Sequence, residues 1–421
     1  MSASIELSPA EQRRGRLCAI ASHPFSMVYR MAIVGTLATQ ALVTLGASAT
    51  AVGAHAGLVS FATLIQLPSL RLLSRIEKRQ LLLWTQIAGL VTGLPLVAFG
   101  WLAGLDSGLA VPLALVSLAL TTLALTSGSA AWWPLLHGFV PRSGTARFFA
   151  ALRSLWHLTL IAFFLGSAWW LKEHPAHFGA LFGVAWLCGL IRALTFLVFP
   201  ERPEGHVEQP RDAFARMRSS PRLRRYLRGV TFDQIGYRAL PPFAVLLLRR
   251  EAGLSEAEVL GLTLSLYTGG LLALLPAGWL SDRVGPRPVL KASCWLRAAV
   301  VAGLAGSVLV CEGTSLLVVF CALFLAWAFL TSAFGVAEVK VLFQLAGDAS
   351  PTGVIVTSVV IRSVVAGAVA LAIGVGIDAA LAAELLPNLS LYVGVFLVLA
   401  TLQAGAALPL TRLDLAAEVS P

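Results

Sequence analysis

Twelve long apolar runs, separated by short stretches rich in proline, glycine and charge, dominate this sequence. A helix needs about 20 apolar residues to cross the hydrocarbon core of a bilayer, so each run is long enough to span a membrane. Only 12% of the 421 residues are charged, about half the share in a soluble domain, so a water-soluble globule could not cover its surface with polar groups. We therefore predict an all-α integral membrane protein with twelve transmembrane helices. The predicted spans are residues 23–45, 52–73, 80–104, 109–137, 147–171, 177–199, 227–248, 257–280, 288–311, 314–344, 352–376 and 388–410.

Lysine and arginine are divided unevenly between the predicted loops. Twenty-one lie in loops and tails on one side of the predicted membrane, and only Lys172, Arg249 and Arg250 lie on the other. Because basic loops stay in the cytoplasm, both termini are predicted to be cytoplasmic and the membrane to be the inner (plasma) membrane. The net charge of +10 is explained by these loops, and we expect no nucleic-acid partner.

The second half of the chain repeats the first at an offset of 208 residues. Tyr237-Arg238 then aligns with Tyr29-Arg30, and several prolines and arginines of the basic loops align as well. The repeat predicts two pseudo-symmetric six-helix bundles, residues 23–199 and 227–410, with cytoplasmic tails at 1–22 and 411–421. The cytoplasmic linker at 200–226 is either solvated or a basic amphipathic helix on the inner leaflet. Parallel repeats of this kind are a transporter design with the substrate site between the halves.

The loop between the eighth and ninth predicted spans carries a motif. The segment GWLSDRVGPRPVL, residues 278–290, matches G-x-L-x-D-R-x-G-x-R-x-x-L and resembles the signature loop of the major facilitator superfamily. The segment at 131–153 is also similar to helix 4 and the following loop of bacterial members of unassigned substrate. The resemblance implies a twelve-helix alternating-access transporter without its own ATPase. The matching residues are Gly278, Leu280, Asp282, Arg283, Gly285, Arg287 and Leu290.

This loop predicts a latch between the two bundles. Asp282 is expected to pair with Arg153 or Arg147 at the inner end of the fifth span, and a pair that breaks and reforms is a bistable element. The alternative is a hydrophilic hairpin with topogenic arginines. The equivalent first-half loop at 70–82 has Ser74 in place of the aspartate, so we expect no equivalent contact there, and Arg362, the repeat partner of Arg153, needs another partner.

Arg30 and Arg238 occupy equivalent places in the two halves. The resemblance implies that helices 1, 4, 7 and 10 line the central cavity, and organophosphate antiporters of the superfamily place one arginine on helix 1 and one on helix 7. Two guanidinium groups facing one cavity would bind an anion. The alternative is that each arginine pairs with an internal acid. Further candidate substrate contacts are Tyr29, Tyr237, Gln40, Gln234, Trp133 and Trp327.

Asp233 and Glu338 are the chief acids within the predicted spans, and each is a candidate proton carrier or a structural charge partner. The arginines and lysine near inner helix ends are expected to extend their charged groups to the membrane interface. These residues are Arg153, Arg192 and Lys340.

The sequence as a whole predicts a secondary active transporter of a small organic anion, coupled to protons or to an anion, acting as a monomer in the lipid bilayer. The alternatives are a proton-driven exporter of apolar or cationic compounds and a transporter-like sensor or scaffold. We expect no enzyme, cofactor or metal site, since no catalytic constellation is present and the five cysteines form no C-x-x-C pair.

Overall fold

The computed structural model describes residues 7–73, 75–137, 139–140, 145–201, 210–346, 351–385 and 387–413, and every regular element in these ranges is helical. Ten segments are long and apolar enough to cross a membrane. Two more segments run alongside them. Residues 78–103 are broken into three short helices, and residues 221–250 form one helix that is rich in arginine. The structure thus confirms the all-α, twelve-helix architecture.

The first bundle contains six membrane-length segments, three of which are interrupted. Gly35 separates two helices of the first segment, and its extended backbone ends one helix and begins the next. The first helix begins at Pro9, inside the predicted tail, because a capping box between Ser8 and Glu11 stabilises its first turn. The elements are α1 (Pro9–Val34), α2 (Thr36–Thr44), α3 (Ala49–Phe61), η1 (Ala62–Ile65), α4 (Gln66–Leu72), α5 (Lys78–Thr92), α6 (Leu94–Val97), α7 (Phe99–Ala103), α8 (Ser107–His137), α9 (Thr145–Glu173) and α10 (Phe178–Phe196).

The second bundle contains six long helices, preceded by a short helix within the predicted linker. A second capping box, Ser255 with Glu258, fixes the start of one of the long helices. Another long helix starts at Pro221, with Ser220 accepting a hydrogen bond from the amide of Leu223. The elements are α11 (Pro210–Ser219), α12 (Pro221–Arg250), α13 (Glu256–Arg283), α14 (Pro286–Val310), α15 (Gly313–Ala346), α16 (Pro351–Ala382) and α17 (Asn388–Thr411).

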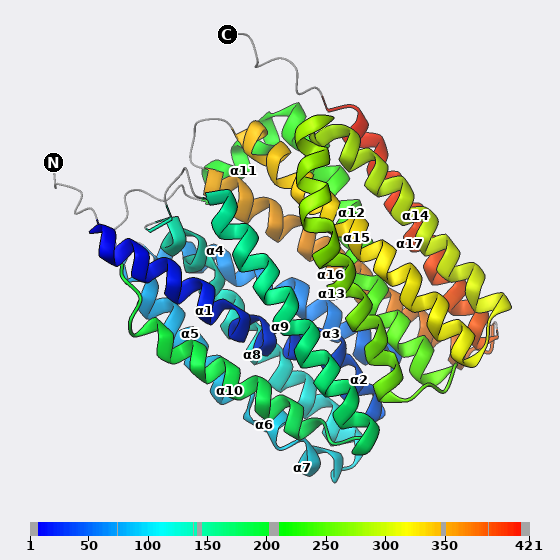
Figure 1. Cartoon of the computed structure of the whole chain (residues 1–421). Helices are drawn as coiled ribbons and strands as arrows, with labels where there is room; N and C mark the ends of the chain where they lie inside the picture. The colour runs from blue at the N-terminus through cyan, green and yellow to red at the C-terminus, as the bar shows by residue number, and fades with distance from the viewer. Residues whose placement is uncertain are drawn as a thin grey trace.

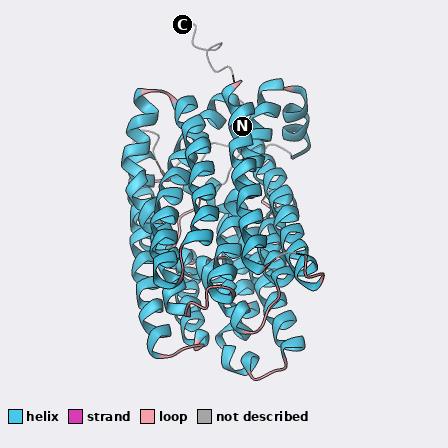
Figure 2. Ribbon diagram, turned by 90° about the vertical axis from the view of Figure 1, so that its right-hand side faces the viewer, coloured by secondary structure: helices cyan, strands magenta, loops and turns pink. Residues whose placement is uncertain are grey.

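The long helices run side by side along one common direction (Figure 2). The helix α1 begins and α17 ends at the same end of the molecule (Figure 1). We call this end the basic face; it carries Arg13, Arg75 and Arg287. The opposite face carries the loops with Lys172 and Arg250.

The two bundles contact each other chiefly through two helix pairs, α3 with α16 and α9 with α13, and α12 also packs against α2 and α3. The helices α3 and α16 lie close together because glycines of α3 face the backbone of α16. A Cβ atom at Gly53 would lie 2.7 Å from the carbonyl oxygen of Ala370, and one at Gly57 would lie 3.1 Å from that of Gly367. Small residues of this kind allow helices in a membrane to approach closely.

Replacing Gly53 with valine is therefore expected to separate the bundles at the opposite face, because the added carbons would overlap the α16 backbone. In the variant, a cysteine introduced at Val43 should react several-fold faster with a membrane-impermeant maleimide. Gly405→Val is the matched control, since a Cβ there meets nothing within 4 Å. Equal labelling rates in the Gly53 variant and the control would contradict the close-packing argument.

Candidate functional site

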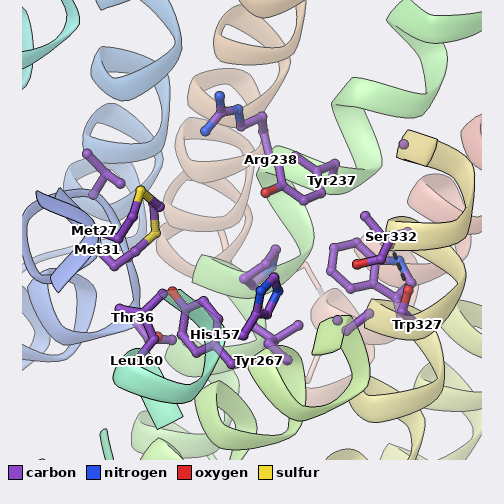
Figure 3. A pocket seen from close by; sticks show the side chains of 18 of the residues that line it. Met27, Met31, Thr36, His157, Leu160, Tyr237, Arg238, Tyr267, Trp327 and Ser332 are labelled. Carbon is purple, nitrogen blue, oxygen red and sulfur yellow. Dashed lines mark hydrogen bonds between the residues drawn. The ribbon is translucent and has the colours of Figure 1, made fainter. Parts of the chain in front are cut away.

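A cavity of about 560 Å³ lies between the two bundles, within the range of small-molecule sites. Its walls come from α1, α2, α3 and α9 of the first bundle and from α12, α13 and α15 of the second. Figure 3 shows side chains from both bundles meeting around it. The resemblance implied that the fourth span would also line the cavity, but none of the residues described as lining it belongs to α8.

The cavity is closed toward the opposite face. Every α12 side chain from Phe243 to Leu248 is fully buried, whereas Tyr237, one helical turn or more closer to the basic face, is 41% exposed. Hydrogen bonds join the bundles at this closed end. Asp378 of α16 accepts bonds from the amides of Ala49 and Thr50 at the start of α3, at 3.0 and 2.7 Å. The cavity lies on the basic side of these contacts.

Helical spacing brings a second set of lining residues to one face of α9. Arg153, Trp156, His157 and Leu160 follow one another at intervals of three, one and three residues, so their side chains project from one side of the helix. Sequence reasoning treated Arg153 only as a latch or interface residue and missed the others. The spacing was visible in the sequence, but it does not indicate which face of an apolar helix meets the cavity.

Two basic side chains of the cavity lack an acidic partner. Arg238 on α12 and Arg153 on α9 both line the cavity, and no hydrogen bond or ion pair joins either side chain to any residue that the structure describes. They come from opposite bundles. In the hydrocarbon region a central arginine costs about 2.5–3.5 kcal/mol on insertion scales, so such groups are usually functional.

Arg30 does not line the cavity with Arg153 and Arg238. Its guanidinium group donates to the Ser129 hydroxyl at 2.9 Å and to the Thr126 hydroxyl at 3.4 Å, both on α8. It remains near enough to Arg238 for the two charges to repel each other. The repeat equivalence of Arg30 and Arg238 therefore does not place both on the cavity wall, because Arg30 turns toward the hydroxyls of α8, whereas Arg238 lines the cavity.

The two acids at the cavity are each engaged by an arginine of their own bundle. Asp233 forms an ion pair with Arg297, whose side chain is completely buried. Glu338 forms an ion pair with Arg362 and also accepts a 2.7 Å hydrogen bond from the Tyr226 hydroxyl. Arg362 thus has the alternative partner that it was expected to need. Neither acid pairs with Arg30 or Arg238.

Aromatic rings form much of the cavity wall. The ring of Tyr237 stacks on that of Trp327, with centroids 5.9 Å apart and planes 13° apart. Gln234 also lines the cavity. Tyr29 and Gln40 do not; Tyr29 is buried and donates to the carbonyl of Gly89 at 2.6 Å, and Gln40 is fully buried. The Trp133 side chain lies outside the described residues.

In the described state Asp282 has a partner in its own bundle, and the expected pair with Arg153 or Arg147 stays a prediction. Its carboxylate pairs with Lys340 of α15, in the same bundle, and not with Arg153, and the Arg147 side chain lies outside the described residues. The Asp282 side chain is 76% exposed. Sequence reasoning could not find this partner, because Lys340 lies 58 positions away and reaches Asp282 only through the packing of α13 on α15. Ser74, at the equivalent first-half position, lies outside the described residues.

The glycines of the signature loop differ in role. Gly285 has a φ of 84° and forms the turn before α14, a conformation that favours glycine. Gly278 lies inside α13 and forms no turn. Arg283 lies over the ring of Trp279, at 5.2 Å, and Arg287 donates to the carbonyl of Thr411.

Replacing Asp282 with asparagine is expected to change the free energy of unfolding by less than about 1 kcal/mol, because exposed ion pairs contribute little. Thermal unfolding in detergent, compared with Lys340→Gln and the double variant, measures the coupling between the two groups. A loss of several kcal/mol would show that the pair has a larger role than its exposure indicates.

Arg192 departs from the expected extension to the membrane interface. Arg192 is 2% exposed, donates to the Ser22 hydroxyl, and lies over the ring of Trp132 at 4.2 Å and that of Phe196 at 4.4 Å. Aromatic rings therefore take the place of an anionic partner for this cation. Lys340, by contrast, extends to the exposed Asp282 at the basic face.

Solved transporter structures share this fold over nearly the whole chain. A mutant of the nucleoside transporter NupG is 11% identical with a TM-score of 0.68, covering 94% of this chain and 98% of that one. An inward-facing bacterial homologue of the iron transporter ferroportin is 16% identical with a TM-score of 0.63, covering 95% and 99%. An inward-facing bacterial homologue of the human lysosomal transporter Spinster is 16% identical with a TM-score of 0.62, covering 96% and 98%.

No protein-family model matches the sequence, and no curated protein matches it significantly. The similar structures are transporters of the major facilitator type. Together with the signature loop at 278–290, they confirm that this chain has the fold of the major facilitator superfamily.

Proposed function

We propose that the chain is a secondary transporter that binds a small organic anion between its two bundles and works by alternating access. The observation that carries this proposal is the charge balance of the cavity. Asp233 and Glu338 are each neutralised by an arginine, whereas Arg153 and Arg238 have no acidic partner among the described side chains. The cavity is therefore cationic, and a carboxylate bound there would supply the missing counter-charge.

The placement of the two arginines also supports a mechanism. Arg153 belongs to the first bundle and Arg238 to the second, so an anion held by both joins the bundles on the side of the basic face. A ligand shifts a conformational equilibrium only if it binds one state more tightly. An anion contacting both arginines would favour the state in which the basic side has closed and the opposite side has opened.

The distribution of basic loops indicates to which side of the membrane the cavity opens. With the basic face in the cytoplasm, as the excess of lysine and arginine there favours, the cavity opens inward and the contacts of Asp378 with α3 close the outer side. The membrane is then the inner membrane of the cell and both chain termini are cytoplasmic.

The two alternative functions are less well supported. The similar structures include a nucleoside transporter and homologues of an iron transporter, so the shared fold does not choose a substrate. A cation exporter needs a free acid in the cavity, but Asp233 and Glu338 are ion-paired. A scaffold would have its cavity charges fully paired, whereas Arg153 and Arg238 are not paired within the described part of the chain.

The test is a thermal-shift screen of the purified protein, followed by uptake into proteoliposomes. Sodium salts of mono- and dicarboxylates are compared with tetraphenylphosphonium chloride at matched ionic strength. Carboxylates are expected to raise the melting temperature, because a ligand that binds the folded state stabilises it. Those that stabilise should also enter the proteoliposomes. Stabilisation by the cation and not by any carboxylate would overturn the proposal in favour of an exporter.

A further inference from the structure

Tyr237 presents a partly exposed aromatic ring to the cavity. Trp327 is 1% exposed and lies behind Tyr237 in a near-parallel stack, whereas Tyr237 itself is 41% exposed. Both residues line the cavity. A tyrosine supported in this way has little rotational freedom. A ligand ring that stacks on it therefore costs little conformational entropy in the tyrosine side chain.

The cationic group lies over this ring. Arg238 is the next residue of α12, and its Cζ atom is 5.6 Å from the centre of the Tyr237 ring. Figure 3 shows Arg238 and Tyr237 together at one part of the cavity. A flat ligand whose ring lay on Tyr237 could therefore present an acidic substituent to Arg238 without a long spacer.

The remaining walls suit an aromatic ligand as well. Tyr267 of α13 stacks on Phe164, with centroids 5.4 Å apart, and meets the His157 ring edge-on at 6.3 Å. Met27 and Met31 of α1 line the first-bundle side and are labelled in Figure 3. Thioether sulfurs make favourable contacts with aromatic edges and adapt to irregular shapes.

From this arrangement we infer that the substrate is an aromatic organic anion, with its ring stacked on Tyr237 and its acidic group bound by Arg238. This inference rests on the proposed transport of organic anions and narrows it to one chemical class. An aliphatic anion would satisfy Arg238 but leave the exposed face of Tyr237 in contact with water or with poorly matched methylene groups.

Three probes of nearly equal size separate the ring from the charge: 2-naphthoate, decahydro-2-naphthoate and 2-naphthamide. Isothermal titration of the full-length protein in nanodiscs should give a dissociation constant for 2-naphthoate at least about tenfold lower than for either other probe. Tyr237→Leu should reduce 2-naphthoate binding to the level of the saturated acid. Tyr237→Phe keeps the ring and should bind 2-naphthoate as the natural protein does.

The outcomes distinguish this inference from the proposed function. Equal affinity for both acids, or no effect of Tyr237→Leu in a variant that remains monodisperse, would overturn the aromatic substrate and leave anion transport intact. The same conclusion follows if aliphatic carboxylates bind and 2-naphthoate does not. Equal binding of 2-naphthamide would remove the role of charge, and failure of every carboxylate, aromatic or aliphatic, would overturn the proposed function itself.

Discussion

Replacing Arg238 with glutamine is expected to weaken the binding of a carboxylate by about ten- to a hundredfold. A hydrogen bond to a charged group contributes about 1.5–3 kcal/mol, and no hydrogen bond or ion pair joins the Arg238 side chain to a described residue. Lysine should not restore a bidentate contact, because its ammonium group cannot donate two parallel hydrogen bonds. Binding of the stabilising carboxylate, measured by isothermal titration, checks both variants.

Two comparisons show whether the loss is specific to the cavity. Arg228→Gln removes an exposed arginine from the same helix, outside the cavity lining, and should leave the affinity unchanged. Arg30→Gln should have a smaller effect than Arg238→Gln, since Arg30 donates to Ser129 and Thr126 and does not line the cavity. Unchanged affinity in both Arg238 variants would contradict the assignment of Arg238 as an anion ligand.

Replacing Asp233 with asparagine is expected to lower the stability of the protein by about 3–5 kcal/mol, because it leaves the buried Arg297 without its counter-charge. Arg297 is 0% exposed and cannot reach water without rearranging α14. Thermal unfolding of the purified variant in detergent should show a large fall in melting temperature.

The double variant Asp233→Leu with Arg297→Met tests whether the charge itself causes this fall. Replacing a buried ion pair by apolar groups of similar volume is often neutral, so the double variant should recover most of the lost stability. Asp282→Asn is the control for a carboxylate in an exposed pair. If Asp233→Asn were as stable as the natural protein, the pair would not be the structural unit that its burial indicates, and the assignment of Asp233 as a proton carrier would gain support.

Sequence patterns that depend on short-range physics predicted the fold well. The length of each apolar run and the placement of loops identified the twelve spans, because a bilayer requires helices of one approximate length with every backbone hydrogen bond made internally. Helix starts extended beyond the predicted limits at α1 and α12, where serine caps at Ser8 and Ser220 add polar turns that hydropathy does not count.

Predictions of individual partners were less successful. Asp282 was expected to pair with Arg153 or Arg147 across the bundles, whereas in the described state it pairs with Lys340 of its own bundle. Asp233 and Glu338 were candidates for proton transfer or charge pairing, and their actual partners, Arg297 and Arg362, lie 64 and 24 positions away. Sequence spacing reports which residues share a helix face, but not which face of another helix packs against it.

The sequence by itself determined that the chain is a two-part helical membrane protein with a basic side, because bilayer thickness and loop charge act on each segment independently. It also marked Arg238 and Tyr237 as neighbours on one helix. Only the tertiary structure decided that Arg153, not Arg30, is the first-bundle arginine that lines the cavity with Arg238, and that Trp327 supports the ring of Tyr237. The physical reason is the rotation of each helix about its axis: a change of one residue in packing register turns a side chain by about 100°, and that register is set by contacts between helices distant in sequence.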